Sequence, residues 1–252
     1  MFIVWGKRVM RKKQGYVADF CPMCRELQTF LLREVRSYSH IYYIPTSANT
    51  LVGYERVCQG CKLALHGAPR QYVAASKRPG HVREIVGRSF PAFHEVYGER
   101  LKVEESLRIS PDGLSPEVRR ALIQQPFLVL SPLVEAQYGR TSVDWVIGAS
   151  LAGGVAVVAL AAQLTEWLPD NYHTACFAVG GALGLGLIIW AFATAVQRFV
   201  KRKIVPRAAR TLKPLRPTET EIAAALADLK RMGHKIGGIL KPKHVVTAIQ
   251  DG

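Results

Sequence analysis

Two long stretches without a charged side chain dominate the hydrophobic pattern of this chain. They cover residues 145–164 and 174–196, and nine residues separate them. A bilayer core about 30 Å thick is crossed by roughly 20 apolar residues in helical conformation, so each stretch is long enough to cross once. Helices in the core of soluble proteins are usually shorter and amphipathic. The pattern therefore predicts a membrane protein with a two-helix transmembrane hairpin over residues 143–196, rather than a buried hairpin of a soluble domain.

Charged residues beside the two stretches predict the orientation of the hairpin. Residues 197–216 contain eight Lys or Arg and no acidic residue, whereas the connection between the stretches contains Glu166 and Asp170 and neither Lys nor Arg. Lys and Arg close to membrane helices remain on the cytoplasmic side. We therefore expect a multi-pass protein of the cell (inner) membrane, with both termini in the cytoplasm.

The overall charge indicates which partners the chain binds. Its 252 residues carry a formal net charge of +15, which is typical of proteins that bind anionic lipid or nucleic acid. More than half of this excess lies in residues 197–216, where anionic headgroups attract each basic side chain by about 1 kcal/mol. We therefore predict the lipid bilayer as a partner, with anionic lipid headgroups at 197–216. Nucleic acid is the less favoured partner, and it would bind a basic N-terminal cluster made of Lys7, Arg8, Arg11, Lys12 and Lys13.

Four of the five cysteines form two C-x-x-C pairs, Cys21 with Cys24 and Cys58 with Cys61, and Cys176 lies in the second apolar stretch. In a reducing cytoplasm such thiols do not form disulfides and can bind metal. Each pair presents two sulfur atoms to one ion, and two pairs complete a tetrahedral Cys₄ site. The 33 residues between the pairs exceed the usual spacing of roughly 15–20 and leave room for strands. The pattern predicts a closed, structural Zn²⁺ site that stabilises a small unit.

Short motifs accompany these cysteines along the chain. They are Phe2-Ile3-Val4-Trp5-Gly6, Cys21-Pro22-Met23-Cys24, Ile41-Tyr42-Tyr43-Ile44-Pro45 and Cys58-Gln59-Gly60-Cys61. Their order resembles the bacterial zinc-ribbon domain family over about residues 1–65. The resemblance implies a three-stranded antiparallel zinc ribbon with the four cysteines as zinc ligands, and it implies no activity. One departure from the family pattern is that Arg25 and Lys62 stand where such turns often have glycine.

The rest of the chain is expected to be mostly helical, which makes the whole a small α+β membrane protein. Within the ribbon, residues 27–38 fit either a strand or a helix, and Gly15 is expected at a turn. A mostly helical cytoplasmic or interfacial region should cover 66–140, and a basic juxtamembrane linker should cover 197–217.

Helix start and stop signals mark the regions on both sides of the hairpin. Ser115-Pro116 is typical of a helix start, Pro126 interrupts the pattern, and Ser131-Pro132 repeats the start signal. Two short helices are therefore expected, either on the membrane surface or in the core of a cytoplasmic domain. An amphipathic helical tail over 218–252 begins with a capping box of Thr218 and Glu221. It is expected to dock on the chain's own cytoplasmic domain or on a partner.

Small residues at helical spacing predict close packing inside the hairpin. They are Gly148, Ala152 and Ala156 on the first helix, and Gly180 and Gly184 on the second. The two apolar stretches contain no Asp, Glu, Lys, Arg or His, whereas transport and proton relay need such groups inside the membrane. A transporter or channel is therefore not expected.

Catalytic patterns do not emerge from the sequence. We find no nucleophile elbow, no phosphate-binding loop and no spacing typical of paired catalytic carboxylates, and a closed Cys₄ site has no open position for substrate. The leading hypothesis is a non-enzymatic, membrane-anchored zinc-ribbon scaffold or adaptor that binds one or more protein partners. The first alternative is a rubredoxin-like electron carrier, in which the same thiolates hold iron instead of zinc. The second alternative is nucleic-acid binding at the membrane surface. The sequence leaves the oligomeric state open.

Overall fold

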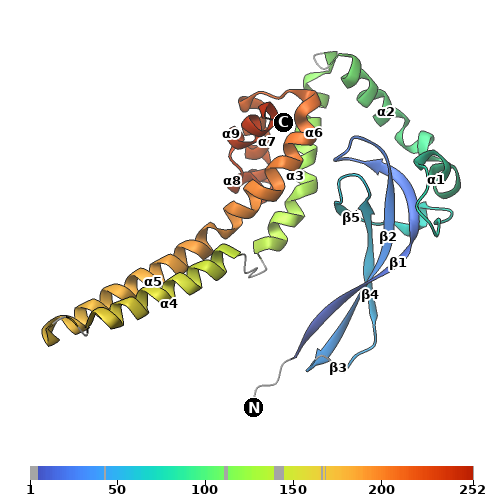
Figure 1. The fold of residues 1–252 in the computed structure, drawn as a ribbon. Coiled ribbons are helices and arrows are strands. Elements are labelled where there is room, and N and C mark those ends of the chain that lie inside the picture. Colours follow the sequence, from blue (N-terminus) through green and yellow to red (C-terminus); the bar gives the residue numbers. More distant parts are fainter. Residues whose placement is uncertain are drawn as a thin grey trace. The chain divides into compact units, whose positions relative to one another are not determined.

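The computed structural model describes residues 5–42, 44–110, 113–138, 145–165, 167 and 169–251. The chain forms two compact units, Met1–Arg119 and Arg120–Gly252, which we name the N-terminal unit and the helical unit. Figure 1 labels their elements. Phe2, Ile3 and Val4 of the first motif lie outside the described part of the chain, and so do residues 143–144 of the predicted hairpin.

An antiparallel sheet forms the first part of the N-terminal unit (Figure 1). Its long strands are β1 (Trp5–Cys21), β2 (Glu26–Ile41) and β4 (Thr50–Cys58), and two short strands, β3 (Ile44–Pro45) and β5 (Ala64–His66), complete it. The strand order is β1-β2-β4-β5, with β3 beside β2. Residues 27–38, which fitted a helix or a strand, belong to β2. The prediction of three strands is therefore incomplete. After β2 and again after β4 the chain turns back and pairs with a free strand edge, which adds β3 and β5 to the sheet.

Gly15 is not at a turn, because β1 runs straight through it with a bulge between Lys13 and Gly15. A Cβ atom at this position would lie only 2.8 Å from both the Ala75 Cβ and the Ser76 carbonyl oxygen. Next to it, Tyr16 and Ser76 exchange two backbone hydrogen bonds of 2.7 and 2.8 Å. The glycine is required here by the close approach of another chain segment rather than by a change of chain direction.

Two helices extend the N-terminal unit well past residue 65. They are α1 (Val82–Ser89) and α2 (Phe93–Ile109), preceded by the short 3₁₀ helix η1 (Pro69–Gln71). The Ser89 hydroxyl accepts a hydrogen bond of 3.0 Å from the Ala18 amide of β1. Phe20 of β1 packs with Phe90 and Phe93 in one aromatic core. The sheet therefore obtains much of its apolar core from a region that we expected to be separate from the ribbon.

The helical unit contains a long helix pair and a cluster of shorter helices (Figure 1). Its elements are α3 (Pro116–Tyr138), α4 (Trp145–Thr165), α5 (Asp170–Phe199), the π-turn η3 (Val200–Ile204), α6 (Val205–Leu212), η4 (Lys213–Leu215), α7 (Glu219–Arg231), α8 (Ile236–Ile239) and α9 (Pro242–Gln250). Helices α4 and α5 lie side by side and extend away from the cluster formed by α3 and α6–α9.

The two short helices expected before the hairpin are one helix. α3 continues through Pro126 and Pro132, although each proline removes a backbone hydrogen bond. The buried side chains of Phe127, Leu130 and Val134 provide the compensating tertiary packing. This apolar face of α3 is therefore buried by packing within the protein.

The segment expected as a basic linker, 197–217, is helical through Leu215. Its apolar side chains, among them Ile204 and Leu212, are buried, and Pro206 follows directly after the π-turn η3 within a continuous helical stretch. Proline signals alone therefore misidentified a core helix as a linker. The tail packs on this core: α9 lies against α6 and α7, and the predicted capping box of Thr218 and Glu221 is confirmed at the start of α7.

The contact between α4 and α5 uses only two of the five predicted small residues. Gly180 and Gly184 are buried in it, but Gly148, Ala152 and Ala156 are exposed. Their expected places are taken by Gly154 and Ala161: a Cβ on Gly184 would lie 3.0 Å from the Gly154 carbonyl oxygen, and one on Gly180 would lie 2.5 Å from the Ala161 Cβ. Several faces of α4 carry small residues, and packing against α5 selects one of them.

Both hairpin helices are long and apolar enough to cross a membrane. They are Trp145–Thr165 and a continuous helical stretch Asn171–Leu215, and only 17% of the most apolar window of each is buried within the protein. Most of the outward surface is apolar, including Val155 and Trp190, which are 70% and 59% exposed. A core helix of a soluble protein would be mostly buried, so this exposure agrees with the expected hairpin.

Candidate metal centre

Both C-x-x-C pairs lie where a long strand ends and the chain turns back. Cys21 is the last residue of β1 and Cys24 lies in the turn before β2, while Cys58 is the last residue of β4 and Cys61 lies in the turn before β5. Both turns lie at the same end of the sheet, because β2 pairs Glu26 with Cys21 and Phe30 with Cys58. The sheet register therefore places two turns that are distant in sequence next to each other.

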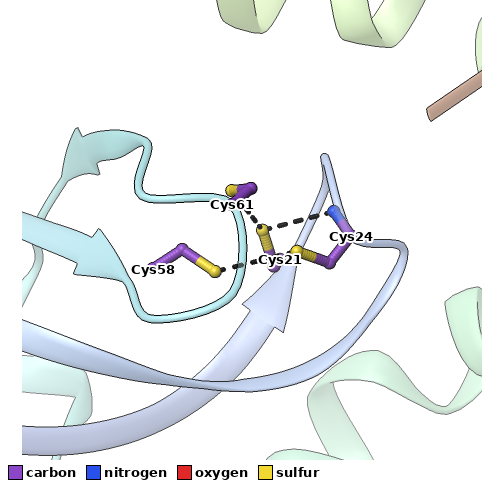
Figure 2. A group of neighbouring side chains, drawn as sticks. All are labelled: Cys21, Cys24, Cys58 and Cys61. Atoms are coloured by element: carbon purple, nitrogen blue, oxygen red, sulfur yellow. Dashed lines mark hydrogen bonds between the residues drawn. The ribbon is translucent and has the colours of Figure 1, made fainter. Parts of the chain in front are cut away.

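All four predicted cysteines converge on one point (Figure 2). The Sγ atoms of Cys21 and Cys61 are 3.7 Å apart, those of Cys24 and Cys58 are 3.8 Å apart, and all four lie within 4.8 Å of one another. Four sulfurs at about 2.3 Å from a tetrahedrally bound ion are separated by about 3.8 Å. The thiol set therefore fits a single tetrahedral metal ion in donor type, number and spacing.

The residues that replace glycine keep the turn geometry. Arg25 and Lys62 adopt the left-handed conformation, with φ of 62° and 58°. Their amides donate to the carbonyl oxygens of Cys21 and Cys58 at 2.7 and 3.1 Å, which closes each turn around its sulfur pair. A non-glycine residue in this conformation costs roughly 1–2 kcal/mol. The departure from the family pattern therefore adds strain but does not change the shape of the site.

Arg25 has a second role that sequence reasoning missed. Its side chain is buried and its Nε donates to the Glu104 carboxylate of α2 at 2.8 Å. Glu104 also pairs with Arg100 at 2.9 Å. This buried ion pair fastens the first cysteine turn to α2. Its partners are 79 residues apart, so no local sequence signal indicates it.

A second ion pair joins the two residues that stand two positions before the first cysteine of each pair. Asp19 is fully buried and forms an ion pair with Arg56 of β4. The same carboxylate accepts hydrogen bonds from the Gln71 amide at 2.6 Å and the Tyr72 hydroxyl at 2.5 Å. Side chains two apart in a strand share one face, so this pair connects the two strands that end at the cysteine turns. It is also a feature that the sequence analysis did not identify.

Close packing shifts the thiol pKa values in opposite directions. Hydrogen bonding with Cys24 is the largest of the effects that raise the pKa of Cys21, whereas hydrogen bonding with Cys21 is the main reason why the pKa of Cys58 falls to about 7. The pKa of Cys61 is lowered as well, also chiefly by Cys21. Four adjacent sulfurs cannot all carry a negative charge unless a cation lies between them, so metal binding releases protons from this cluster.

No protein-family model, curated protein or solved structure matches this chain. The resemblance to the bacterial zinc-ribbon domain family therefore stays a prediction. What the structure itself shows is a metal-binding arrangement of four cysteines, consistent with a zinc-ribbon-like site, together with two helices that can cross a membrane.

Proposed function

We propose that this chain is a membrane-anchored protein with a structural zinc centre, and that it acts as a scaffold or adaptor for a protein partner rather than as an enzyme. The observation that carries the proposal is the convergence of four cysteine sulfurs within 4.8 Å. All four ligand positions of a tetrahedral ion are then occupied by protein, and no position remains for substrate. When bound, zinc supplies folding energy at this end of the sheet, and Cys21, Cys24, Cys58 and Cys61 hold it.

The helix pair α4–α5 is the proposed anchor in the cell membrane, with both chain termini in the cytoplasm. The continuous helix from α5 to η4 limits which basic residues reach the headgroups. With a rise of 1.5 Å per residue, Arg216 lies up to about 27 Å beyond Arg198 along the helix, whereas electrostatic attraction decays over about 8 Å. Anionic headgroups therefore interact mainly with Arg198, Lys201, Arg202 and Lys203, and the later basic residues of 197–216 face the cytoplasm.

Fusion proteins test this topology. Green fluorescent protein fused to the C-terminus should fluoresce, and alkaline phosphatase inserted after Trp167 should be active, because that enzyme folds only outside the cytoplasm. An inactive insertion at the turn together with an active C-terminal phosphatase fusion would reverse the orientation. Activity at neither position, with a chain that does not float with membranes, would contradict the anchor itself.

An electron carrier remains the second candidate, and one observation favours it. Arg25 and Lys62 stand where cysteine turns often have glycine, and they adopt the left-handed conformation that glycine would provide. Thiolate geometry fits iron as well as zinc, because ligand type alone does not separate the two metals. The identity of the metal therefore decides between a scaffold and a redox protein.

Metal analysis of the full chain distinguishes these functions. The protein is purified anaerobically in detergent from iron-replete cells and examined by elemental analysis and visible spectroscopy. One zinc per chain without visible absorption supports the scaffold, and crosslinking in cells then identifies its partner. One iron per chain with thiolate charge-transfer bands and a reversible potential overturns it. The variant Cys21→Ser should lose the metal, and Cys176→Ser is the matched control because Cys176 lies outside the cluster.

A further inference from the structure

At the end of the sheet opposite the cysteine site, the three long strands continue as an arm that neither α1 nor α2 covers. It consists of residues 5–14 of β1 and 33–41 of β2, with β3 and the first half of β4 beside them, and most of its side chains are exposed or half-buried. Figure 1 shows this part of the sheet reaching past the helices of its own unit. Because neither helix of its own unit packs on it, the arm is not part of the core that the sheet forms with α1 and α2.

The end of the arm is apolar. The β2–β3 turn presents Ile41, Tyr42 and Ile44, which are 43%, 44% and 68% exposed, and we name these three residues the arm tip. Tyr42 has φ of 47°, a conformation that glycine or asparagine adopts at lower cost. An isolated exposed apolar residue is ordinary, but a cluster at a projecting end marks an interaction site.

Basic residues follow directly behind the arm tip. The register pairs Trp5 with Ile41, so Lys7 and Arg8, both exposed, lie about 7 and 10 Å behind it at 3.4 Å per residue. Residues 5–18 and 35–54 contain no acidic side chain at all. The arm therefore has an apolar tip, and the part of the arm behind this tip is positively charged.

We propose that the arm tip inserts into the surface of an anionic bilayer. Amphipathic segments enter the boundary between headgroups and acyl chains by about 5–10 Å, which places Lys7 and Arg8 at the level of the lipid phosphates. The inference rests on the proposed membrane anchor, because a tethered arm needs only a weak second contact. Two of the three arm-tip side chains, Ile41 and Ile44, are aliphatic and offer no aromatic surface on which a base could stack, and two arms of net positive charge repel each other.

A simpler explanation of the charges is that Lys and Arg on the exposed edge strand β1 prevent edge-to-edge aggregation. That function needs charges along the strand but gives no reason for exposed apolar side chains beyond them. It also predicts no dependence on lipid. Contact with lipid at the arm tip therefore separates the two explanations.

Photocrosslinking of the full chain in lipid vesicles tests the proposal. The photoreactive residue p-benzoylphenylalanine replaces Ile44, Val155 or Val73 in three separate proteins, each in phosphatidylcholine vesicles with or without phosphatidylglycerol. Val155 reports on the hairpin, and Val73, 78% exposed in the N-terminal unit, is the control in water. We expect lipid adducts at position 155 in both vesicles, adducts at position 44 mainly in the anionic vesicles, and none at position 73.

A charge variant with a matched control sharpens the test. Lys7→Gln combined with Arg8→Gln should lower the adduct yield at position 44 in anionic vesicles by about fivefold for each charge removed. Lys77→Gln combined with Arg78→Gln removes the same charge from another exposed site of the N-terminal unit and should leave the yield unchanged.

Each contrary outcome points to a specific failure. No adduct at position 155 contradicts the membrane anchor, whereas an adduct at 155 with equal, low yields at 44 and 73 contradicts only the insertion of the arm tip. Crosslinking of position 44 to a second copy of the chain, or to an added oligonucleotide in preference to lipid, would overturn the proposal in favour of that partner.

Discussion

The N-terminal unit and the helical unit bury different kinds of side chain. Around the cysteine site the buried residues include charged groups, namely Asp19, Arg25 and Glu104, and four thiols. In the cluster of α3 and α6–α9 they are mainly aliphatic, such as Leu122, Leu212 and Ile222. One unit is thus organised by polar groups with obligatory partners, and the other by close apolar packing.

This difference has consequences for stability. Buried charges stabilise a fold only while each partner is present, and a removed partner leaves an uncompensated charge. Apolar packing loses free energy gradually, in proportion to the atoms removed. The N-terminal unit should therefore respond sharply to loss of one ligand or one charge, whereas the helical unit should respond to side-chain size.

Loss of a metal ligand should have the largest effect and should affect only one unit. Structural zinc contributes on the order of 10 kcal/mol, so Cys21→Ser is expected to unfold the sheet while α7 stays protected. Hydrogen exchange followed by mass spectrometry measures both regions in one sample. Cys176→Ser, the control, should change neither. Equal loss of protection in α7 would show that the two units do not differ in this way.

Removal of the buried Asp19 charge should come next. Asp19→Asn keeps the size of the side chain but leaves Arg56 without its carboxylate, which typically destabilises by about 3–5 kcal/mol. Chemical denaturation of the metal-bound protein gives the value, and Glu26→Gln on the exposed surface of β2 is the control. A loss below about 1 kcal/mol would mean that Gln71 and Tyr72 alone satisfy this site.

Truncation in the apolar core should affect the other unit. Phe127 is fully buried in α3, and Phe127→Ala should cost about 3–5 kcal/mol of helical-unit stability without changing the metal content. The neighbouring Leu128 is 39% exposed, so Leu128→Ala is a matched control on the same turn. Chemical denaturation, monitored by hydrogen exchange of the α7 amides, measures the effect. Loss of metal in Phe127→Ala would contradict the proposal that the two units are stabilised independently.

Two adjacent glycines test the packing of the hairpin. A Cβ at Gly180 would lie 2.5 Å from the Ala161 Cβ, whereas one at Gly181 meets nothing within 4 Å. Gly180→Val should therefore destabilise the α4–α5 contact by about 1–3 kcal/mol, and Gly181→Val should not. Thermal unfolding in lipid nanodiscs measures the difference. Similar values for both variants would show that another face of α4 meets α5.

Acid should produce the smallest effect, at the surface of the helical unit. Arg120, with its Nε at 3.1 Å, and Arg231 lower the pKa of Asp228 below its ordinary 3.8. A carboxyl with a lowered pKa in the folded state stabilises the fold above its ordinary pKa, and this contribution is lost as pH falls through the lowered value. Melting temperatures of the native protein and of Asp228→Asn should therefore differ slightly at pH 7 and converge below about pH 4. If the two melting temperatures differed by the same amount in acid as at pH 7, the ion pairs of Asp228 would be excluded as the cause.

The features predicted correctly depend on local pattern. Two C-x-x-C pairs, two apolar stretches of membrane length and the capping box at Thr218 can each be found within a short window. The incorrect predictions concern positions where a local rule met a stronger tertiary contact. Pro126 lies within a continuous helix because Phe127 and Leu130 are buried beside it, and Gly15 lies within a strand because another segment pairs next to it.

By itself the sequence determined which atoms can bind metal and which helices can cross a membrane, because both depend on side-chain chemistry and on the length of an apolar run. Only the tertiary structure decided how Arg25 and Lys62 close the cysteine turns, which partners Asp19 and Arg25 find, and which face of α4 meets α5. Those outcomes depend on contacts between residues as far apart as Arg25 and Glu104, 79 positions along the chain. Such contacts leave no periodic or local signal, since their free energy arises only when the sheet register and helix packing bring the groups together.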